Sequence, residues 1–195
     1  MDATRRRFAY DLYARSREHD AALSDRLERF RNVEPPTAEL LGVLIRATGA
    51  RRILELGTSN GYSAIWLADA AESTGGSVVS VDVDASRTEL ARENLGVAGL
   101  AALVELRTED AAETLARSGD AGWEFVFLDA ERPAYPSYLP DLVRTLAPRG
   151  VLAIDNVESH AHELVDFTAL IEAAPALTQT VVPVGAGLRL AVRDR

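Results

Sequence analysis

Three oxygen-bearing side chains follow two apolar runs in the second half of the chain. Phe125–Leu128 leads into Asp129, and Val151–Ile154 leads into Asp155 and Asn156. Because parallel strands end at the same edge of a sheet, neighbouring strands of this kind would bring two carboxylates and one amide oxygen together. That donor set suits a hard divalent cation such as Mg²⁺ or Ca²⁺. The structural alternative is that Asp129 caps a helix and that Asp155-Asn156 forms a turn.

A glycine-containing turn from Glu55 to Ser63 follows an earlier apolar run. Gly57 permits a sharp turn beneath a ligand, and Gly61 permits the following helix to approach the strand closely. Exposed amides near Ser63 would hold a carboxylate or a phosphate. The turn lacks the G-x-G-x-x-G spacing of dinucleotide sites, and Glu55 would repel a pyrophosphate. The positive sulfonium and ammonium groups of S-adenosylmethionine would be attracted instead, so the turn favours this cofactor.

Two further strand ends carry groups suited to a nucleoside. Asp82 follows Val78–Val81, where a carboxylate accepts hydrogen bonds from ribose hydroxyls. Asp110 and Ala111 come after the next apolar run and could contact an adenine amine. Asp110 is equally well placed to cap a helix, so both interpretations stay open.

These side chains need a scaffold in which apolar strands alternate with helices. The expected strands are Ile53–Leu56, Val78–Val81, Leu103–Leu106, Phe125–Leu128 and Val151–Ile154, and the expected helices are 62–73, 85–95, 110–118 and 135–147. The alternation predicts an α/β fold with a mostly parallel sheet and helices on both faces. After a helix at about 161–173, the runs Thr180–Val184 and Leu188–Val192 should pair as an antiparallel hairpin that completes seven strands.

The N-terminal part is predicted to be helical. The first thirty or so residues form one expected helix, with Leu23, Leu27 and Phe30 on a shared face, and a second helix covers residues 37 to about 48. No repeat, low-complexity tract or linker interrupts the chain. Residues 1–195 are therefore predicted to form a single domain, with a helical segment 1–36 ahead of a core at 37–195.

Composition excludes several kinds of chemistry. The 195 residues contain no cysteine, and all 21 basic residues are arginine, which removes thiol nucleophiles, Schiff-base lysines and lysine general bases. A formal net charge of −9 argues against a nucleic-acid partner. No apolar stretch approaches the roughly 20 residues that span a bilayer, so we expect a soluble, cytoplasmic protein with no membrane partner.

Taken in order, these motifs resemble those of the class I S-adenosylmethionine-dependent methyltransferases, and among them the cation-dependent catechol and caffeoyl-CoA O-methyltransferases. The similarity runs from Pro35-Pro36 to the last strand. It is carried by ELGTSNGYS at 55–63, SVDVD at 80–84, VFLDAERPAY at 126–135, AIDNV at 153–157 and VPVGAGLRLAVR at 182–193. The resemblance implies a Rossmann-like methyltransferase fold and an N-terminal helical segment that acts as a lid.

The resemblance also assigns roles to residues. It implies that Asp129, Asp155 and Asn156 are metal ligands. The cofactor-binding candidates are Glu55, Gly57, Ser59, Gly61, Ser63, Asp82, Asp110, Ala111 and Asp129. Family members commonly carry a lysine where this chain has Arg132, and that lysine is thought to help deprotonate the substrate hydroxyl. Arg132 stays protonated and cannot be the base, although it can stabilise a phenolate, so the catalytic candidates are Asp129 and Arg132.

The sequence therefore predicts methyl transfer from S-adenosylmethionine to a hydroxyl of a small, catechol-like aromatic acceptor, assisted by a divalent cation. His160 and His162 are further candidate proton acceptors, or simply surface residues near a helix start. The alternatives are a metal-independent O- or N-methyltransferase and a non-catalytic module that binds S-adenosylmethionine. An NAD(P) oxidoreductase is a further class to exclude. By the same resemblance, a homodimer is expected.

Overall fold

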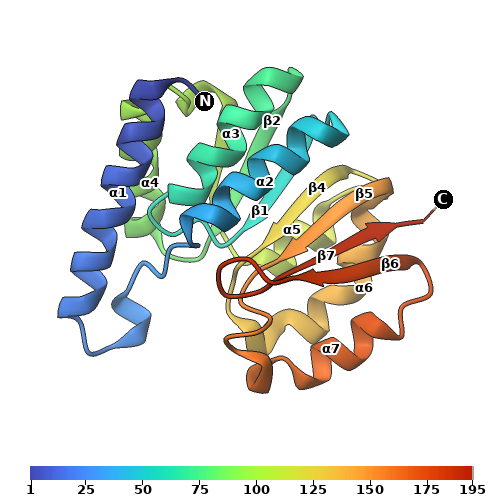
Figure 1. Cartoon of the computed structure of the whole chain (residues 1–195). Helices are drawn as coiled ribbons and strands as arrows, with labels where there is room; N and C mark the ends of the chain where they lie inside the picture. The colour runs from blue at the N-terminus through green and yellow to red at the C-terminus, as the bar shows by residue number, and fades with distance from the viewer. Residues whose placement is uncertain (195) are drawn as a thin grey trace.

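Seven strands form one sheet in the computed structural model of the chain, which describes residues 1–194 (Figure 1). The strands are β1 Arg52–Leu56, β2 Ser77–Asp82, β3 Val104–Thr108, β4 Trp123–Leu128, β5 Leu146–Ile154, β6 Leu177–Val182 and β7 Leu188–Arg193. Their order across the sheet is β3-β2-β1-β4-β5-β7-β6. Strands β1 to β5 run parallel, and β7 runs antiparallel to both β5 and β6. The predicted fold class and the closing hairpin are confirmed.

Helices cover both faces of the sheet (Figure 1). One layer contains α1 Ala3–Ala22, α2 Pro35–Thr48, α3 Tyr62–Thr74 and α4 Ala85–Val97, and the other contains α5 Ala111–Arg117, α6 Tyr135–Thr145 and α7 Val165–Glu172. Short 3-10 turns occupy Arg26–Glu28, Ala101–Leu103, Arg132–Ala134 and Ala161–Glu163. None of the helices within residues 1–194 is long and apolar enough to cross a bilayer.

The central strands are apolar throughout because both of their faces are buried. On β4, Phe125 and Phe127 pack against the layer that contains α3, whereas Val126 and Leu128 pack against the layer that contains α6. All four side chains are fully buried. This two-sided burial is the physical reason why the continuous apolar runs in the sequence predict strands correctly.

The predicted N-terminal helix is wrong over its last third. Helix α1 ends at Ala22, and Leu23, Leu27 and Phe30 lie outside it; Leu27 is largely exposed. Two carboxylates stop the helix: Asp20 accepts hydrogen bonds from the amides of Phe30 and Arg31, at 2.7 and 2.9 Å, and Asp25 caps the 3-10 turn. Residues 23–34 therefore form an irregular connection between α1 and α2, called the strap below.

The carboxyl ends of β1 and β4 lie side by side. Strands β2 and β3 follow on one side of this pair and β5 on the other, so the strand order changes direction here. The amide of Gly57 donates to the Val81 carbonyl at 2.9 Å, and the amide of Asp129 donates to the Leu56 carbonyl at 2.9 Å. Gly57 has φ 108°, and a Cβ there would overlap the carbonyl of Asp129. Only glycine allows these two strand ends to approach so closely.

The closing hairpin holds the end of β5 in position. The amides of Val157 and Glu158 donate to the carbonyls of Gly187 and Ala186, both at 3.1 Å. Gly187 has φ 87°, and a Cβ there would overlap Glu158. The hairpin therefore fixes the loop that directly follows Asp155 and Asn156.

Replacing Gly57 by alanine is expected to lower the free energy of unfolding by more than about 2 kcal/mol, because it adds both backbone strain and a clash with Asp129. The matched control is Gly49→Ala, where φ is also positive but nothing lies within 4 Å of the added Cβ. That control should cost about 1 kcal/mol. Equal costs in urea unfolding would contradict the close approach.

Candidate functional site

A cavity of about 530 Å³ opens at the carboxyl ends of the parallel strands, within the size range of small-molecule sites. The strand ends supply its floor and the strap supplies much of its wall. The predicted residues that line it are Gly57, Ser59, Ser63, Asp82, Asp110, Ala111, Asp129, Arg132 and Asn156. Glu55, Gly61 and Asp155 are not among the lining residues. The structure therefore gathers most of the predicted site into one concave surface.

The glycine turn is tied to the end of β2. The amide of Ser59 donates to Asp82 Oδ2 at 2.7 Å, and the amide of Asp84 donates to Asp82 Oδ1 at 3.0 Å. Each carboxylate oxygen of Asp82 thus keeps a lone pair toward the cavity. Gly61, at φ 82°, makes its close approach to Ala91 of α4 and not to the strand, which corrects the predicted packing partner.

Glu55 lies beneath the turn and is fully buried. Its Oε2 accepts a hydrogen bond from the Ser80 hydroxyl at 2.5 Å, whereas its Oε1 has no hydrogen-bond partner. Burial raises the pKa of Glu55 to about 7, and the hydrogen bond from the Ser80 hydroxyl opposes this rise only in part. The carboxylate is therefore a potential negative charge held just behind the cavity floor.

Asp110 combines both interpretations that the sequence left open. Its Oδ1 accepts a hydrogen bond from the Ala112 amide at 2.7 Å, so it caps α5. Asp110 and Ala111 also line the cavity, on the side of Asp82. Capping uses one carboxylate oxygen and leaves the other available to a ligand.

The structure brings Asp129, Asp155 and Asn156 together at the ends of β4 and β5. The Asn156 amide nitrogen donates to Asp129 Oδ1 at 3.2 Å and to Asp155 Oδ2 at 2.9 Å. Asp155 is buried, and its Oδ1 has no hydrogen-bond partner. Asp129 caps no helix, because Glu131 precedes the 3-10 turn that follows. Within residues 1–194 no group of three or more His, Cys, Asp or Glu side chains is arranged for a metal, so this set depends on Asn156 as its third member.

The two carboxylates of this cluster are electrostatically unfavourable when both are ionised. Burial, and then the neighbouring Asp155 carboxylate, raise the pKa of Asp129 well above its usual range. Burial raises the pKa of Asp155 to about 6. Nearby guanidinium groups of Arg31 and Arg132 act in the opposite direction on Asp129 without cancelling these effects. The nearby guanidinium groups therefore do not balance the negative charge of the two ionised carboxylates.

Arg132 is buried beside the carboxylate pair. Its Nε donates to Glu163 Oε2 at 2.7 Å, and this ion pair fixes the direction of the guanidinium group. His160 lines the same part of the cavity, and its Nδ1 lies 2.8 Å from the Ser159 hydroxyl. His162 does not line the cavity; it is largely exposed near Glu163.

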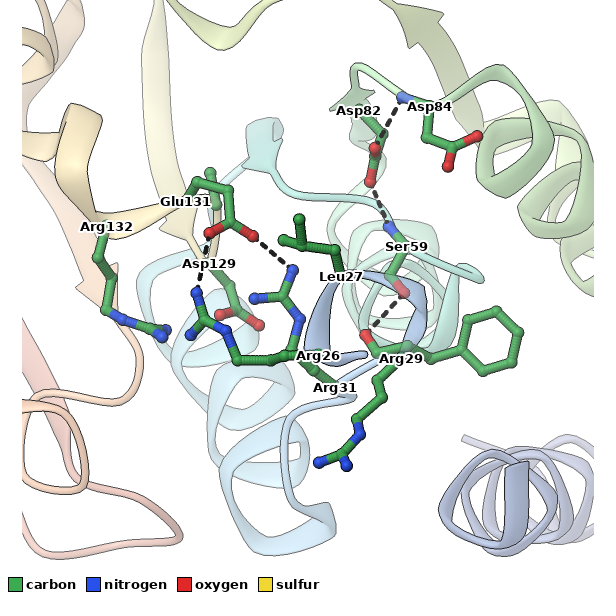
Figure 2. Close-up of polar contacts among 12 residues, drawn as sticks. Arg26, Leu27, Arg29, Arg31, Ser59, Asp82, Asp84, Asp129, Glu131 and Arg132 are labelled. Carbon is green, nitrogen blue, oxygen red and sulfur yellow. Dashed lines mark hydrogen bonds and ion pairs between the residues drawn. The ribbon is translucent and has the colours of Figure 1, made fainter. Parts of the chain in front are cut away.

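The resemblance predicted that the N-terminal segment lies over the site, but sequence reasoning assigned no residue of the strap to the site. The strap's Arg26, Arg29, Phe30 and Arg31 line the cavity, and the Ser59 hydroxyl donates to the Phe30 carbonyl at 2.8 Å (Figure 2). Arg87 of α4 also donates to the carbonyl of Arg29 at 3.0 Å. The available signal was Ser24-Asp25, a pair typical of a helix boundary, inside the predicted N-terminal helix.

Comparison with known proteins gives consistent matches. A family described as O-methyltransferase matches residues 24–194. A catechol O-methyltransferase of Niastella koreensis is 33% identical over 129 residues, which are 65% of this chain and 58% of that protein. The O-methyltransferase of Bacillus cereus, solved in complex with SAH, is 27% identical with a TM-score of 0.78, covering 100% of this chain and 92% of that chain. TomG of Streptomyces achromogenes, an O-methyltransferase solved with SAM, is 32% identical with a TM-score of 0.78, covering 100% and 91%.

Replacing Glu55 by glutamine should make the stability of the chain less dependent on pH. The folded pKa of about 7 lies above the usual value of 4.5, so the neutral form is favoured on folding and that stabilisation is lost as pH rises through about 7. The free energy of unfolding of Glu55→Gln, relative to that of the parent chain, should rise by up to about 3 kcal/mol between pH 5 and pH 8. Urea unfolding at the two pH values measures this gain.

The matched control is Glu124→Gln on β4. Glu124 accepts hydrogen bonds from the amides of Arg51 and Arg52, which lower its pKa although burial opposes them. Its replacement should cost similar stability at both pH values. A pH-independent effect of Glu55→Gln would contradict the assignment of a raised pKa.

Proposed function

Because this chain belongs to the O-methyltransferase family, whose members use S-adenosylmethionine, we propose that it methylates a hydroxyl of a small, catechol-like aromatic acceptor with the help of a divalent cation. The observation that carries the proposal is the cluster formed by Asp129 and Asn156, which line the cavity, and the buried Asp155 beside them. Two carboxylates with raised pKa values and one buried oxygen without a partner fit a positively charged occupant. The name of the Niastella relative supports the acceptor class.

The residues for the cofactor lie along the glycine turn and the ends of β2 and β3. S-adenosylmethionine supplies a methyl group on a positively charged sulfur. Asp82 would accept hydrogen bonds from the ribose hydroxyls, using the lone pairs that Ser59 and Asp84 leave free. Asp110 and Ala111 would border the adenine. The amides at the start of α3, near Ser63, would hold the methionine carboxylate.

The residues for the cation are Asp129, Asp155 and the side-chain oxygen of Asn156. A bound Mg²⁺ or Ca²⁺ lowers the pKa of a coordinated hydroxyl, which removes the need for a strong base in the protein. The Asn156 amide, as placed, donates to both carboxylates, so its side chain would rotate to present its oxygen. Asn156 has φ 64°, a left-handed conformation that asparagine tolerates better than most residues.

Arg132 would stabilise the negative charge that develops on the acceptor oxygen. Its guanidinium group is held by Glu163 and cannot accept a proton. A guanidinium group already fixed beside the reacting oxygen needs no reorganisation during the reaction. Positioning of this kind supplies much of enzymatic acceleration. The proton of the acceptor hydroxyl would therefore pass to another group, either His160, which lines the same cavity, or water.

Methylation of catechol should require the cation. We expect turnover with added Mg²⁺ to fall to background in excess EDTA, and Asp155→Asn to lose at least about 100-fold in kcat/KM because a charged ligand is replaced by a neutral, weaker one. Binding of S-adenosylhomocysteine, measured by calorimetry, should change little in this variant. Full activity in EDTA would remove the cation from the mechanism and leave methyl transfer in place.

Arg132→Gln is expected to lower kcat for catechol by about 10- to 100-fold, as for the loss of one charge-stabilising donor. The affinity for S-adenosylhomocysteine should stay constant. Arg92→Gln on the exposed face of α4 removes the same charge far from the cavity and serves as the control. An unchanged kcat in Arg132→Gln would show that Arg132 only closes an ion pair with Glu163.

A further inference from the structure

The cavity is lined by side chains of both charges. At the ends of β2 and β3 its wall carries Asp82, Glu109 and Asp110, together with Arg87 of α4. Near Asp129 the strap and the β4 loop contribute guanidinium groups, from Arg26, Arg31 and Arg132. The chain has a formal net charge of −9, whereas these three arginines place positive charge together on one wall of the cavity.

Two of these arginines share one carboxylate. Arg31 pairs with Glu131 Oε1 at 2.5 Å, and Arg26 pairs with Glu131 Oε2 at 3.4 Å. Figure 2 shows both guanidinium groups meeting the Glu131 side chain beside Asp129. The side chains of Glu131, Arg26 and Arg31 are 48%, 43% and 30% exposed. Ion pairs this exposed contribute little to stability, so they exchange readily for a competing anion.

The positive groups outnumber their protein partners. The three guanidinium groups are paired with two carboxylates, Glu131 and Glu163. The Nε of Arg31 is buried and has no hydrogen-bond partner. A divalent cation on Asp129 and Asp155 would cancel the charge of that pair, so this wall would keep an excess of one positive charge.

We propose that Arg26 and Arg31 bind a carboxylate substituent of the methyl acceptor, and that Glu131 occupies this position until the acceptor arrives. The inference rests on the proposed function, because it places the acceptor's hydroxyls at Asp129. A carboxylate is the chemistry favoured here, since the group that now joins both arginines is itself a carboxylate. Planar guanidinium groups also suit paired hydrogen bonds to a carboxylate.

A purely structural role for these ion pairs predicts a different pattern. If Arg26, Arg31 and Glu131 only hold the strap against the β4 loop, removing any of them loosens the cavity in the same way. If Glu131 is a placeholder, its removal frees the two arginines and strengthens the binding of an anionic acceptor. Under the proposal, and not under a purely structural role, the arginine variants weaken binding of an anionic acceptor and the Glu131 variant strengthens it.

The experiment is calorimetric titration of the full chain, saturated with S-adenosylhomocysteine and Mg²⁺, with protocatechuate and with its neutral primary amide. We expect the parent chain to bind the carboxylate at least about tenfold more tightly than the amide, the value of one charge-assisted hydrogen bond. Arg31→Gln and Arg26→Gln should each reduce that preference severalfold. Glu131→Gln should increase it, and the charge-matched control Arg92→Gln should leave it unchanged.

The outcomes separate this inference from the proposed function. Equal binding of the two ligands, a preference unchanged in both arginine variants, weaker carboxylate binding in Glu131→Gln, or no binding of protocatechuate would each overturn the inference. Turnover of catechol without a carboxylate preference would leave the proposed function standing. A carboxylate preference that depends on Arg26 and Arg31, without any methylation, would support the carboxylate site itself and contradict the proposed function.

Discussion

Repulsion between two neighbouring carboxylates, the buried Asp155 and the half-buried Asp129, is the constraint around which this site is organised. Asp129 and Asp155 follow neighbouring parallel strands, and the amide of Asp155 donates to the Leu128 carbonyl at 3.2 Å. The backbone therefore places Asp129 on the cavity floor with Asp155 buried next to it, where burial disfavours the ionised form of each and the Asp155 carboxylate further disfavours that of Asp129. Such an arrangement opposes folding at neutral pH unless a positive charge occupies it, and that cost is typical of a binding site.

Other features of the fold maintain this unfavourable arrangement. Gly57 lets β1 and β4 end side by side, and the β6–β7 hairpin holds the loop after Asn156. Arg132, locked by Glu163, supplies a fixed positive charge at the edge of the pair. The strap forms much of the cavity wall opposite the strand ends. A methyl donor, a cation and an acceptor bound there would meet with little bulk water. The carboxylates at the ends of β2 and β3 would contact the donor and the arginines of the strap would contact the acceptor, which would orient both ligands before reaction.

The sequence predicts the sheet well because its signals are local. Each central strand is a continuous apolar run, and the polar residue after each run marks the edge where ligands bind, as with Leu128 before Asp129. The strap was not predictable in this way. Helix α1 ends because Asp20 binds the amides of Phe30 and Arg31, and the strap lies against the cavity because Ser59 and Arg87 donate hydrogen bonds to its Phe30 and Arg29 carbonyls. Contacts between residues so far apart leave no periodic pattern in a single sequence.

Proton release on cation binding tests the central claim most directly. Calorimetric titration of Mg²⁺ into the chain near pH 6, in buffers with different ionisation enthalpies, reports how many protons leave as the cation binds. Because burial raises the pKa of both Asp129 and Asp155, we predict binding accompanied by net proton release that disappears in the double variant Asp129→Asn, Asp155→Asn. Mg²⁺ binding without proton release, or no binding at all, would contradict the account.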